Sequence, residues 1–181
     1  MRIVAGAWRG RALAAPAGEV TRPTADRVRQ AVFDRLMHAP WGGRAVLEGA
    51  RVLDGFAGTG AMGLEALSRG AAEAVFIEKD RAALTALRAN VAACRGEERC
   101  RVIPGDALRP PPGVACGLVF LDPPYGSGLA GPAVAALRAA GWIGPGALAV
   151  IEVGRGDAAP AVGEAVAGFS AGAASVVVVR L

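Results

Sequence analysis

The feature that most constrains the fold is an alternation, from residue 50 onward, of short apolar runs with segments of helical periodicity. Apolar runs predict strands at residues 51–54, 74–78, 101–103, 116–121, 147–153 and 175–179. Helices are expected at 61–69, 81–93, 132–140 and, in the Gly- and Ala-rich tail, 159–167. Strands that are apolar throughout are buried on both faces, which is typical of a mainly parallel sheet covered by helices. The sequence therefore predicts an α/β fold.

The first part of the chain precedes this alternation. Residues 2–15 hold four strand formers around a turn at 9–11 and predict a short β-hairpin. A helix is expected from Thr24, which can cap it, to about Met37. A chain of 181 residues suits one domain with a small appendage. We therefore divide it into an N-terminal β-hairpin extension at 1–20 and a main domain at 21–181.

Composition excludes several classes of protein. Hydrophobic residues make up 53% of the chain, which excludes wholesale disorder. No apolar run reaches the ~18–20 residues of a membrane span, and the first nine residues lack the apolar stretch of a signal peptide. We therefore expect a cytoplasmic protein. Cys94, Cys100 and Cys116 lack CxxC spacing, and His38 is the only histidine, so no metal site and no serine–histidine–aspartate triad is predicted.

The charge is unevenly distributed. The net charge is +4, but residues 1–51 contain nine arginines and only four acidic residues. The remainder of the chain is close to neutral. A GC-rich genome accounts for arginine in place of lysine, since Lys79 is the only lysine, but not for the position of the excess. A basic first part fits a polyanionic partner.

Acidic residues follow four successive predicted strands: Asp54, Glu78, Asp106 and Asp122. In open α/β sheets, ligands bind outside the carboxyl ends of the strands. Four carboxylates at that edge therefore predict a ligand site there.

A glycine loop lies between the first strand and the helix at 61–69. Residues 58–63 match GxGxxG, and Glu78 is the acid expected about 20 residues later. This pattern alone is compatible with an NAD-dependent oxidoreductase. The residues before it, Asp54-Gly55-Phe56-Ala57, instead make the loop similar to the first motif of S-adenosylmethionine-dependent methyltransferases.

That resemblance implies a cofactor site. Asp54 would lie near the cationic methionine end of S-adenosyl-L-methionine, Glu78 would accept hydrogen bonds from the ribose hydroxyls, and Asp106 would meet the adenine amino group. Glycines let a backbone approach a ligand closely. The remaining cofactor-binding residues implied are Phe56, Gly58, Thr59, Gly60, Lys79 and Ala107.

The second motif is Asp122-Pro123-Pro124-Tyr125, which closes an apolar strand. It resembles the signature of enzymes that methylate exocyclic amines of adenine, cytosine or guanine. Such an amine is a poor nucleophile because its lone pair is delocalised into the ring. The Asp122 carboxylate and the Pro123 carbonyl can accept hydrogen bonds from it, while Pro124 fixes the chain and Tyr125 stacks on the extruded base.

Further stretches carry a more specific resemblance: residues 2–11, 22–29, 54–60, 64–70 and 122–125. Together they resemble the bacterial 16S ribosomal RNA guanine-N2 methyltransferase family, which modifies guanine 966 of that RNA. The resemblance implies a Rossmann-like class I methyltransferase fold with a seven-stranded, mostly parallel sheet. The main domain would be the methyltransferase domain, and the extension would contact RNA.

The same resemblance implies how the protein meets its substrate. The partner would be 16S ribosomal RNA in the small ribosomal subunit or its assembly intermediate, and we expect a monomer. Trp8 either stacks on a base or belongs to the hairpin core, and Arg22 and Arg27 serve either the RNA or the cofactor site. The arginines expected to contact phosphates are Arg2, Arg9, Arg11, Arg22, Arg27 and Arg29.

Three alternatives remain open from the sequence. A DNA adenine-N6 or cytosine-N4 methyltransferase fits the second motif, although 181 residues leave little room for a domain that reads DNA sequence. An NAD-dependent oxidoreductase fits the glycine pattern. A catalytically inactive RNA-binding protein fits the charge, but the presence of Asp122 and Tyr125 argues against it.

Overall fold

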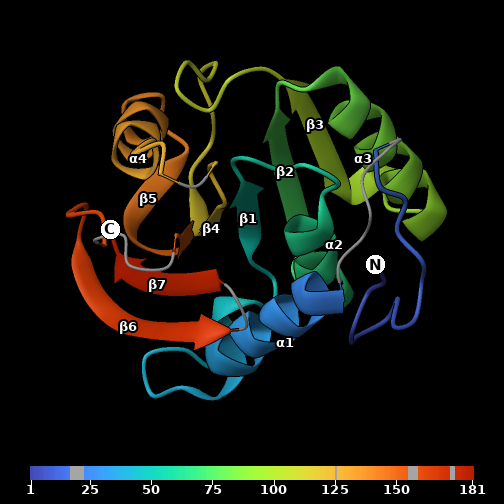
Figure 1. Ribbon diagram of the computed structural model, residues 1–181, viewed down its shortest axis with the longest axis horizontal. Helices are drawn as coiled ribbons and strands as arrows, with labels where there is room; N and C mark the ends of the chain where they lie inside the picture. Colours follow the sequence, from blue (N-terminus) through green and yellow to red (C-terminus); the bar gives the residue numbers. More distant parts are fainter. Residues whose placement is uncertain (17–22, 125, 155–158, 172–173) are drawn as a thin grey trace.

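The computed structural model describes residues 1–16, 23–124, 126–154, 159–171 and 174–181. A seven-stranded sheet forms its centre, in the order β3-β2-β1-β4-β5-β7-β6 (Figure 1). The strands are β1 Arg51–Asp54, β2 Glu73–Glu78, β3 Cys100–Pro104, β4 Cys116–Leu121, β5 Ile143–Val153, β6 Glu164–Ala171 and β7 Ala174–Arg180. This confirms the predicted α/β, Rossmann-like architecture.

Strands β1 to β5 are parallel to their neighbours, and β7 runs antiparallel between β5 and β6. The predicted helix at 159–167 is wrong, because β6 begins at Glu164. Glycine and alanine side chains fill little space and set no strong period. Pairing with the valine-rich β7 therefore decides the conformation of this segment.

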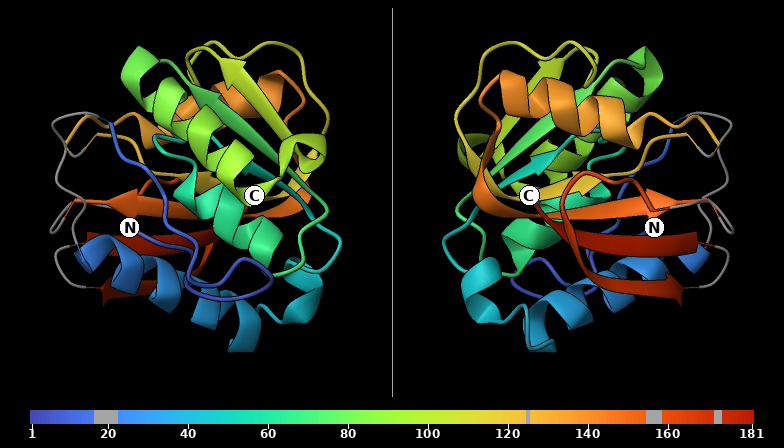
Figure 2. Two further views of the ribbon diagram at one scale, coloured as in Figure 1. Left: turned by 90° about the vertical axis from the view of Figure 1, so that its right-hand side faces the viewer. Right: turned by 90° about the vertical axis from the view of Figure 1, so that its left-hand side faces the viewer.

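Helices cover both faces of the sheet. They are α1 Pro23–His38, α2 Ala61–Ser68, α3 Arg81–Cys94 and α4 Ala130–Ala139, with short 3-10 turns at Arg44–Val46 and Glu97–Arg99. Helices α1, α2 and α3 share one apolar cluster with one face of the sheet, and α4 shares a second cluster with the opposite face. Figure 2 shows α2 and α3 on one side and α4 on the other.

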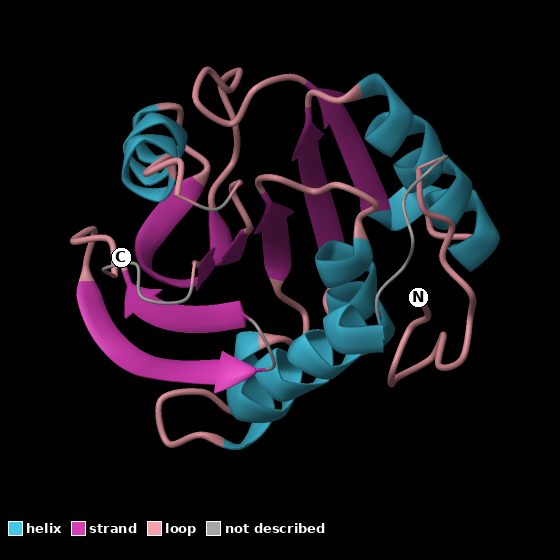
Figure 3. Cartoon of the chain, in the orientation of Figure 1, coloured by secondary structure: helices cyan, strands magenta, loops and turns pink. Residues whose placement is uncertain are grey.

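Residues 1–16 reverse direction but do not form two strands. A single bridge joins Arg2 to Ala12, and Figure 3 draws this segment as loop. The predicted β-hairpin is thus reduced to one bridge. The segment keeps some hairpin-like bonds, such as Ile3 N to Arg11 O at 2.9 Å, but its turn also bonds to the end of α2, where Ala7 N donates to Ser68 O at 2.7 Å.

The same segment is part of the main core. Ile3 and Leu13 are buried in the cluster shared with α1, α2 and α3. The proposed boundary between residues 20 and 21 lies outside the described residues. Among the residues that the structure describes, no helix has both the length and the apolarity to cross a membrane.

Candidate active site

Acidic residues from five neighbouring strands meet at the carboxyl edge of the sheet. In sheet order they are Asp106, Glu78, Asp54, Asp122 and Glu152. The strands pair in register, with Asp54 opposite both Phe76 and Phe120. Because side chains alternate between faces, Asp54 and Glu78 point to the same face. The carboxylates are therefore concentrated in one region, as the sequence predicted for four of them.

Asp54 is the most deeply buried of these acids, with 3% of its surface exposed. Its Oδ2 accepts a hydrogen bond from Gly63 N at 3.1 Å. Burial raises the pKa of Asp54 to about 8; the Gly63 bond opposes this rise, and repulsion from Asp122 and Glu78 adds to it. A buried carboxylate surrounded by other carboxylates favours a cationic ligand.

The glycines of the loop are required by its geometry. Gly60 has φ 77° and begins α2, and a Cβ there would lie 2.2 Å from Leu87 Cδ1. A Cβ on Gly63 would lie 2.4 Å from Phe76 Cε1. Gly58 has φ 53°, and no atom lies within 4 Å of where its Cβ would stand. Gly58 thus leaves open space beside the backbone, whereas Gly60 and Gly63 let α2 pack closely against its neighbours.

Glu78 holds the turn around that loop. Its Oε2 accepts from Gly58 N at 2.7 Å, and its Oε1 accepts from Lys79 N and Asp80 N, each at 2.8 Å. A carboxylate offers about four acceptor sites. These three bonds therefore leave room for about one more, so the ribose contact expected of Glu78 remains a prediction.

The other residues expected around a cofactor lie nearby in the chain. Asp106 accepts from Leu108 N at 3.0 Å, and this bond, followed by Lys79, holds its pKa below the usual value. Lys79 Nζ lies 3.4 Å from Asp106 Oδ2. Ala107 is buried, so its contact with a cofactor remains a prediction. Phe56 packs at the edge of the second cluster.

Asp122 and Pro123 follow β4 directly. Pro123 is buried and Pro124 is exposed, whereas Tyr125 lies outside the described residues. Burial, and next the charge of Glu152, raise the pKa of Asp122 to about 7. Asp122 is nevertheless exposed, so solvation limits this rise in its pKa more than it does for the buried Asp54.

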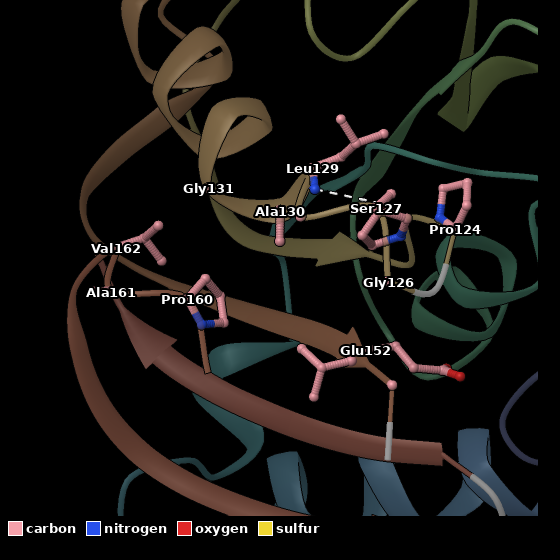
Figure 4. A pocket seen from close by; sticks show the side chains of 14 residues that line it. Pro124, Gly126, Ser127, Leu129, Ala130, Gly131, Glu152, Pro160, Ala161 and Val162 are labelled. Carbon is pink, nitrogen blue, oxygen red and sulfur yellow. Dashed lines mark hydrogen bonds between the residues drawn. The ribbon is translucent and has the colours of Figure 1, made fainter. Parts of the chain in front are cut away.

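A cavity of about 480 Å³ lies beside Pro123 and Pro124 (Figure 4). Its walls come from the 126–128 loop, the start of α4, the end of β5 and residues 160–162. Glu152, near the end of β5, is among the residues that line the cavity. The cavity thus joins the second motif to a carboxylate that no sequence motif marked.

One predicted phosphate contact is wrong. Arg29 is 2% exposed and pairs with Asp26 at 2.8 Å and with Glu65 at 3.3 Å. It also donates to the carbonyl of Arg2. Its guanidinium therefore stabilises α1 against α2 and is not available to RNA. Arg22 lies outside the described residues.

The other described arginines that were expected to contact phosphates are more accessible to solvent. Arg2, Arg9, Arg11 and Arg27 are exposed, although Arg11 also donates to the carbonyl of Ala93 at the end of α3. The turn at 6–10 lies by the ends of α2 and α3, so Arg9 is at the amino edge of the sheet, away from the acids.

Trp8 is half-buried and packs against the core. The guanidinium of Arg99 lies 4.8 Å from its ring centroid. This arrangement favours the structural alternative for Trp8 over stacking on a base.

The family model described as conserved hypothetical protein 95 matches residues 1–174. The chain belongs to this family. It is 42% identical over 154 residues to ribosomal RNA small subunit methyltransferase D of Escherichia coli K12, covering 84% of this chain and 74% of the relative. The Haemophilus influenzae protein of the same name is 38% identical over 157 residues, covering 84% and 78%.

Solved structures agree with this family membership. The structure of the methyltransferase yhhF of Escherichia coli is 36% identical, with a TM-score of 0.82 over 99% of this chain and 97% of that one. The ribosomal RNA methyltransferase aviRa of Streptomyces viridochromogenes is 18% identical, with a TM-score of 0.66 over 94% and 90%. At that identity, aviRa supports the class I methyltransferase fold alone.

Two buried polar residues near the site were not found from the sequence. Glu65 is 0% exposed and accepts from Val4 N at 2.8 Å and Ala5 N at 3.0 Å. Asn90 donates to Thr59 O at 2.9 Å and to Ala14 O at 3.0 Å. Both connect the N-terminal segment to the elements that carry the glycine loop. The four partners named here are distant in sequence, so no local pattern could mark these contacts.

Proposed function

We propose that this protein transfers a methyl group from S-adenosyl-L-methionine to the exocyclic N2 amine of a guanine, guanine 966, in 16S ribosomal RNA of the small ribosomal subunit. The observation that carries the proposal is the placement of Asp122 and Pro123 directly after β4, which lies in the sheet between β1, with its glycine loop, and β5, whose end lines the 480 Å³ cavity. The names of the relatives, which are small-subunit ribosomal RNA methyltransferases, support the substrate class.

The residues present fit this cofactor. Asp54 is buried and has carboxylates as neighbours, so a ligand with an ammonium group relieves an unfavourable arrangement. The open space beside Gly58 lets the backbone approach a ligand closely. Asp54, Gly58, Glu78 and Asp106 would hold the cofactor, which supplies an electrophilic methyl group on a sulfonium.

Asp122 has the central part in the proposed mechanism. Its carboxylate accepts a hydrogen bond from the amine, and the Pro123 carbonyl accepts a second, so the nitrogen lone pair is directed at the methyl group. Catalysis then consists of positioning and electrostatic stabilisation. After transfer, the amine nitrogen loses a proton, and Asp122 is placed to receive it.

The acid cluster argues against the oxidoreductase alternative. A dinucleotide presents a pyrophosphate to the glycine loop, and the buried carboxyl of Asp54 at that loop is no partner for a phosphate but fits an ammonium group. Glu78 is compatible with both cofactors. The DNA alternative shares the second motif, and no feature of the described residues favours it. Arg2, Arg9, Arg11 and Arg27 remain our candidates for phosphate contacts. We also propose that the protein acts as a monomer in the cytoplasm.

The decisive experiment is methylation of small subunits from a strain that lacks the modification. With purified protein and labelled S-adenosyl-L-methionine, we expect N2-methylguanosine, identified by nucleoside mass spectrometry. Asp122→Ala should lower transfer by at least ~100-fold and leave the cofactor dissociation constant, measured by calorimetry, nearly unchanged. Transfer to duplex DNA and not to subunits would support the DNA alternative, and binding of NAD alone would support the oxidoreductase.

A further inference from the structure

Glu152 lies beside Asp122 at the carboxyl edge of the sheet. In the parallel pair β4–β5, Leu121 is opposite Ile151, so Asp122 and Glu152 are the next residues on neighbouring strands. Glu152 is half-buried and lines the cavity with Pro123. After burial, the charge of Glu152 is the second cause of the raised pKa of Asp122. The strand register, the cavity lining and the effect of its charge therefore all place Glu152 beside Asp122 and Pro123.

The bases that carry exocyclic amines differ at the ring nitrogen next to the amine. In guanine, N1 bears a hydrogen and lies beside the C2 amine, so both groups donate. In adenine and cytosine, the corresponding ring nitrogen is an acceptor. An ionised carboxylate can only accept. A carboxylate beside the amine site therefore pairs with guanine and faces a lone pair in the other two bases.

We propose that Glu152 selects guanine by accepting a hydrogen bond from N1–H while Asp122 accepts from the neighbouring N2 amine. The inference rests on the proposed function and names the residue that sets its base specificity. Neighbouring strands lie about 4.8 Å apart, so one base edge can meet both carboxylates. Glu152 also has an interaction within the protein, and a carboxylate has about four acceptor sites, of which the proposed contact with N1–H needs one.

The test compares two bases with the same C2 amine. Small subunits are reconstituted with 16S RNA that carries guanine or 2-aminopurine at the target position; 2-aminopurine has an acceptor at N1. We expect the unmodified protein to prefer guanine by about 10- to 100-fold in kcat/KM. Glu152→Gln, whose amide can donate to N1, should lower the preference to within about threefold. The change in this ratio between the two proteins cancels the different intrinsic reactivities of the amines.

Two further variants separate specificity from stability. Glu152→Asp keeps a carboxylate, so it should retain the preference for guanine even where the rate falls. Glu48→Gln makes the same carboxylate-to-amide change at an exposed position before β1 and should alter neither rate nor ratio. Calorimetry with S-adenosyl-L-methionine should give the same dissociation constant for Glu152→Gln as for the unmodified protein.

The outcomes are distinct. Equal loss of activity of Glu152→Gln on both bases, or a parallel loss of cofactor affinity, would overturn the assignment. If Glu152→Gln does not fold, as judged by thermal melting, loss of the guanine preference in Glu152→Asp overturns it and retention supports it. If the unmodified protein adds no N2-methylguanosine to guanine-containing subunits, the proposed function fails, and the assignment of Glu152 fails with it.

Discussion

Asp54 should make binding of the proposed cofactor depend on pH. Its carboxyl is buried and its pKa is raised to about 8, so at neutral pH it is mostly protonated in the free protein. A bound ammonium group favours the carboxylate form, and binding therefore releases a proton. We predict that the affinity for S-adenosyl-L-methionine rises with pH between about 6 and 7.5, and that Asp54→Asn removes this dependence.

The magnitude follows from the pKa. A rise in the pKa of Asp54 from 3.8 to about 8 corresponds to ~6 kcal/mol in favour of the neutral carboxyl, at about 1.36 kcal/mol per pKa unit. Below pH 8 the ionised form of Asp54 becomes about tenfold rarer with each unit that the pH falls. The affinity for S-adenosyl-L-methionine should therefore change ~20-fold between about pH 6 and 7.5. The Asp54 carboxyl keeps its proton to a higher pH in the folded protein than in the unfolded chain. The free energy of unfolding without cofactor should therefore fall as pH rises from about 4 to 8. Asp54→Asn should therefore be the more stable protein at about pH 8.

Calorimetry in two buffers of different ionisation enthalpy measures both the dissociation constant and the protons released. We expect about one proton released at pH 7. The measurements stop at about pH 7.5 because the α-amino group of the cofactor, whose ordinary pKa is ~8, is then still mostly charged. Glu78 and Asp122 also act on Asp54; Asp122→Asn is the matched control and should keep most of the slope, because Asp122 is open to solvent.

The role of Asp54 is refuted if the affinity of Asp54→Asn for S-adenosyl-L-methionine depends on pH as steeply as that of the unmodified protein. The titrating group must then lie elsewhere. The role of Asp54 is refuted equally if binding at pH 7 releases no proton. A pH-independent affinity in the unmodified protein would mean that the complex keeps Asp54 neutral, and the ammonium would then not be its partner.

Three further predictions follow from buried contacts. Asn90→Ala should weaken binding of S-adenosyl-L-methionine, measured by calorimetry, by ~10-fold because Thr59 O loses its donor. Ser68→Ala affects only the turn of the N-terminal segment that bonds to Ser68, and it should leave this affinity unchanged. Glu65→Gln should lower the free energy of unfolding in urea by ~3–5 kcal/mol, since two buried guanidiniums lose their counter-charge; the more exposed Glu73→Gln should cost no more than ~1 kcal/mol. Gly60→Ala should lower the melting temperature through its clash with α3, measured by circular dichroism.

The central strands that the sequence predicted correctly are almost completely buried. Strands such as Val52–Leu53 and Phe76–Ile77 are apolar on both faces, so periodicity and length identify them without knowledge of their partners. The tail differs. Residues 164–171 are mostly small, and their pairing with β7 depends on valines that follow in the chain. Local propensity could not predict that pairing.

The same distinction applies to the site. Asp54 and Glu78 end their strands and Asp122 directly follows β4, so the general rule for carboxyl edges predicted them. Glu152 lies one residue before the end of β5 and could be read as part of the strand. Asn90 contacts residues 76 and 31 positions away, and such contacts exist only after folding.

The arginine excess at the front requires a more restricted interpretation than the sequence suggested. Arg29 is buried with Glu65, Arg51 pairs with Glu73, and the Arg35 guanidinium lies 3.9 Å from the centroid of the Phe169 ring. These side chains already have partners within the protein, so the excess partly stabilises the packing of α1, α2 and the sheet. A count of charges by position in the chain cannot separate such arginines from solvent-facing ones, because it contains no information on burial. The basic surface proposed for RNA therefore rests on the exposed arginines of the front segment, and its strength follows from their number and not from the net charge of the segment.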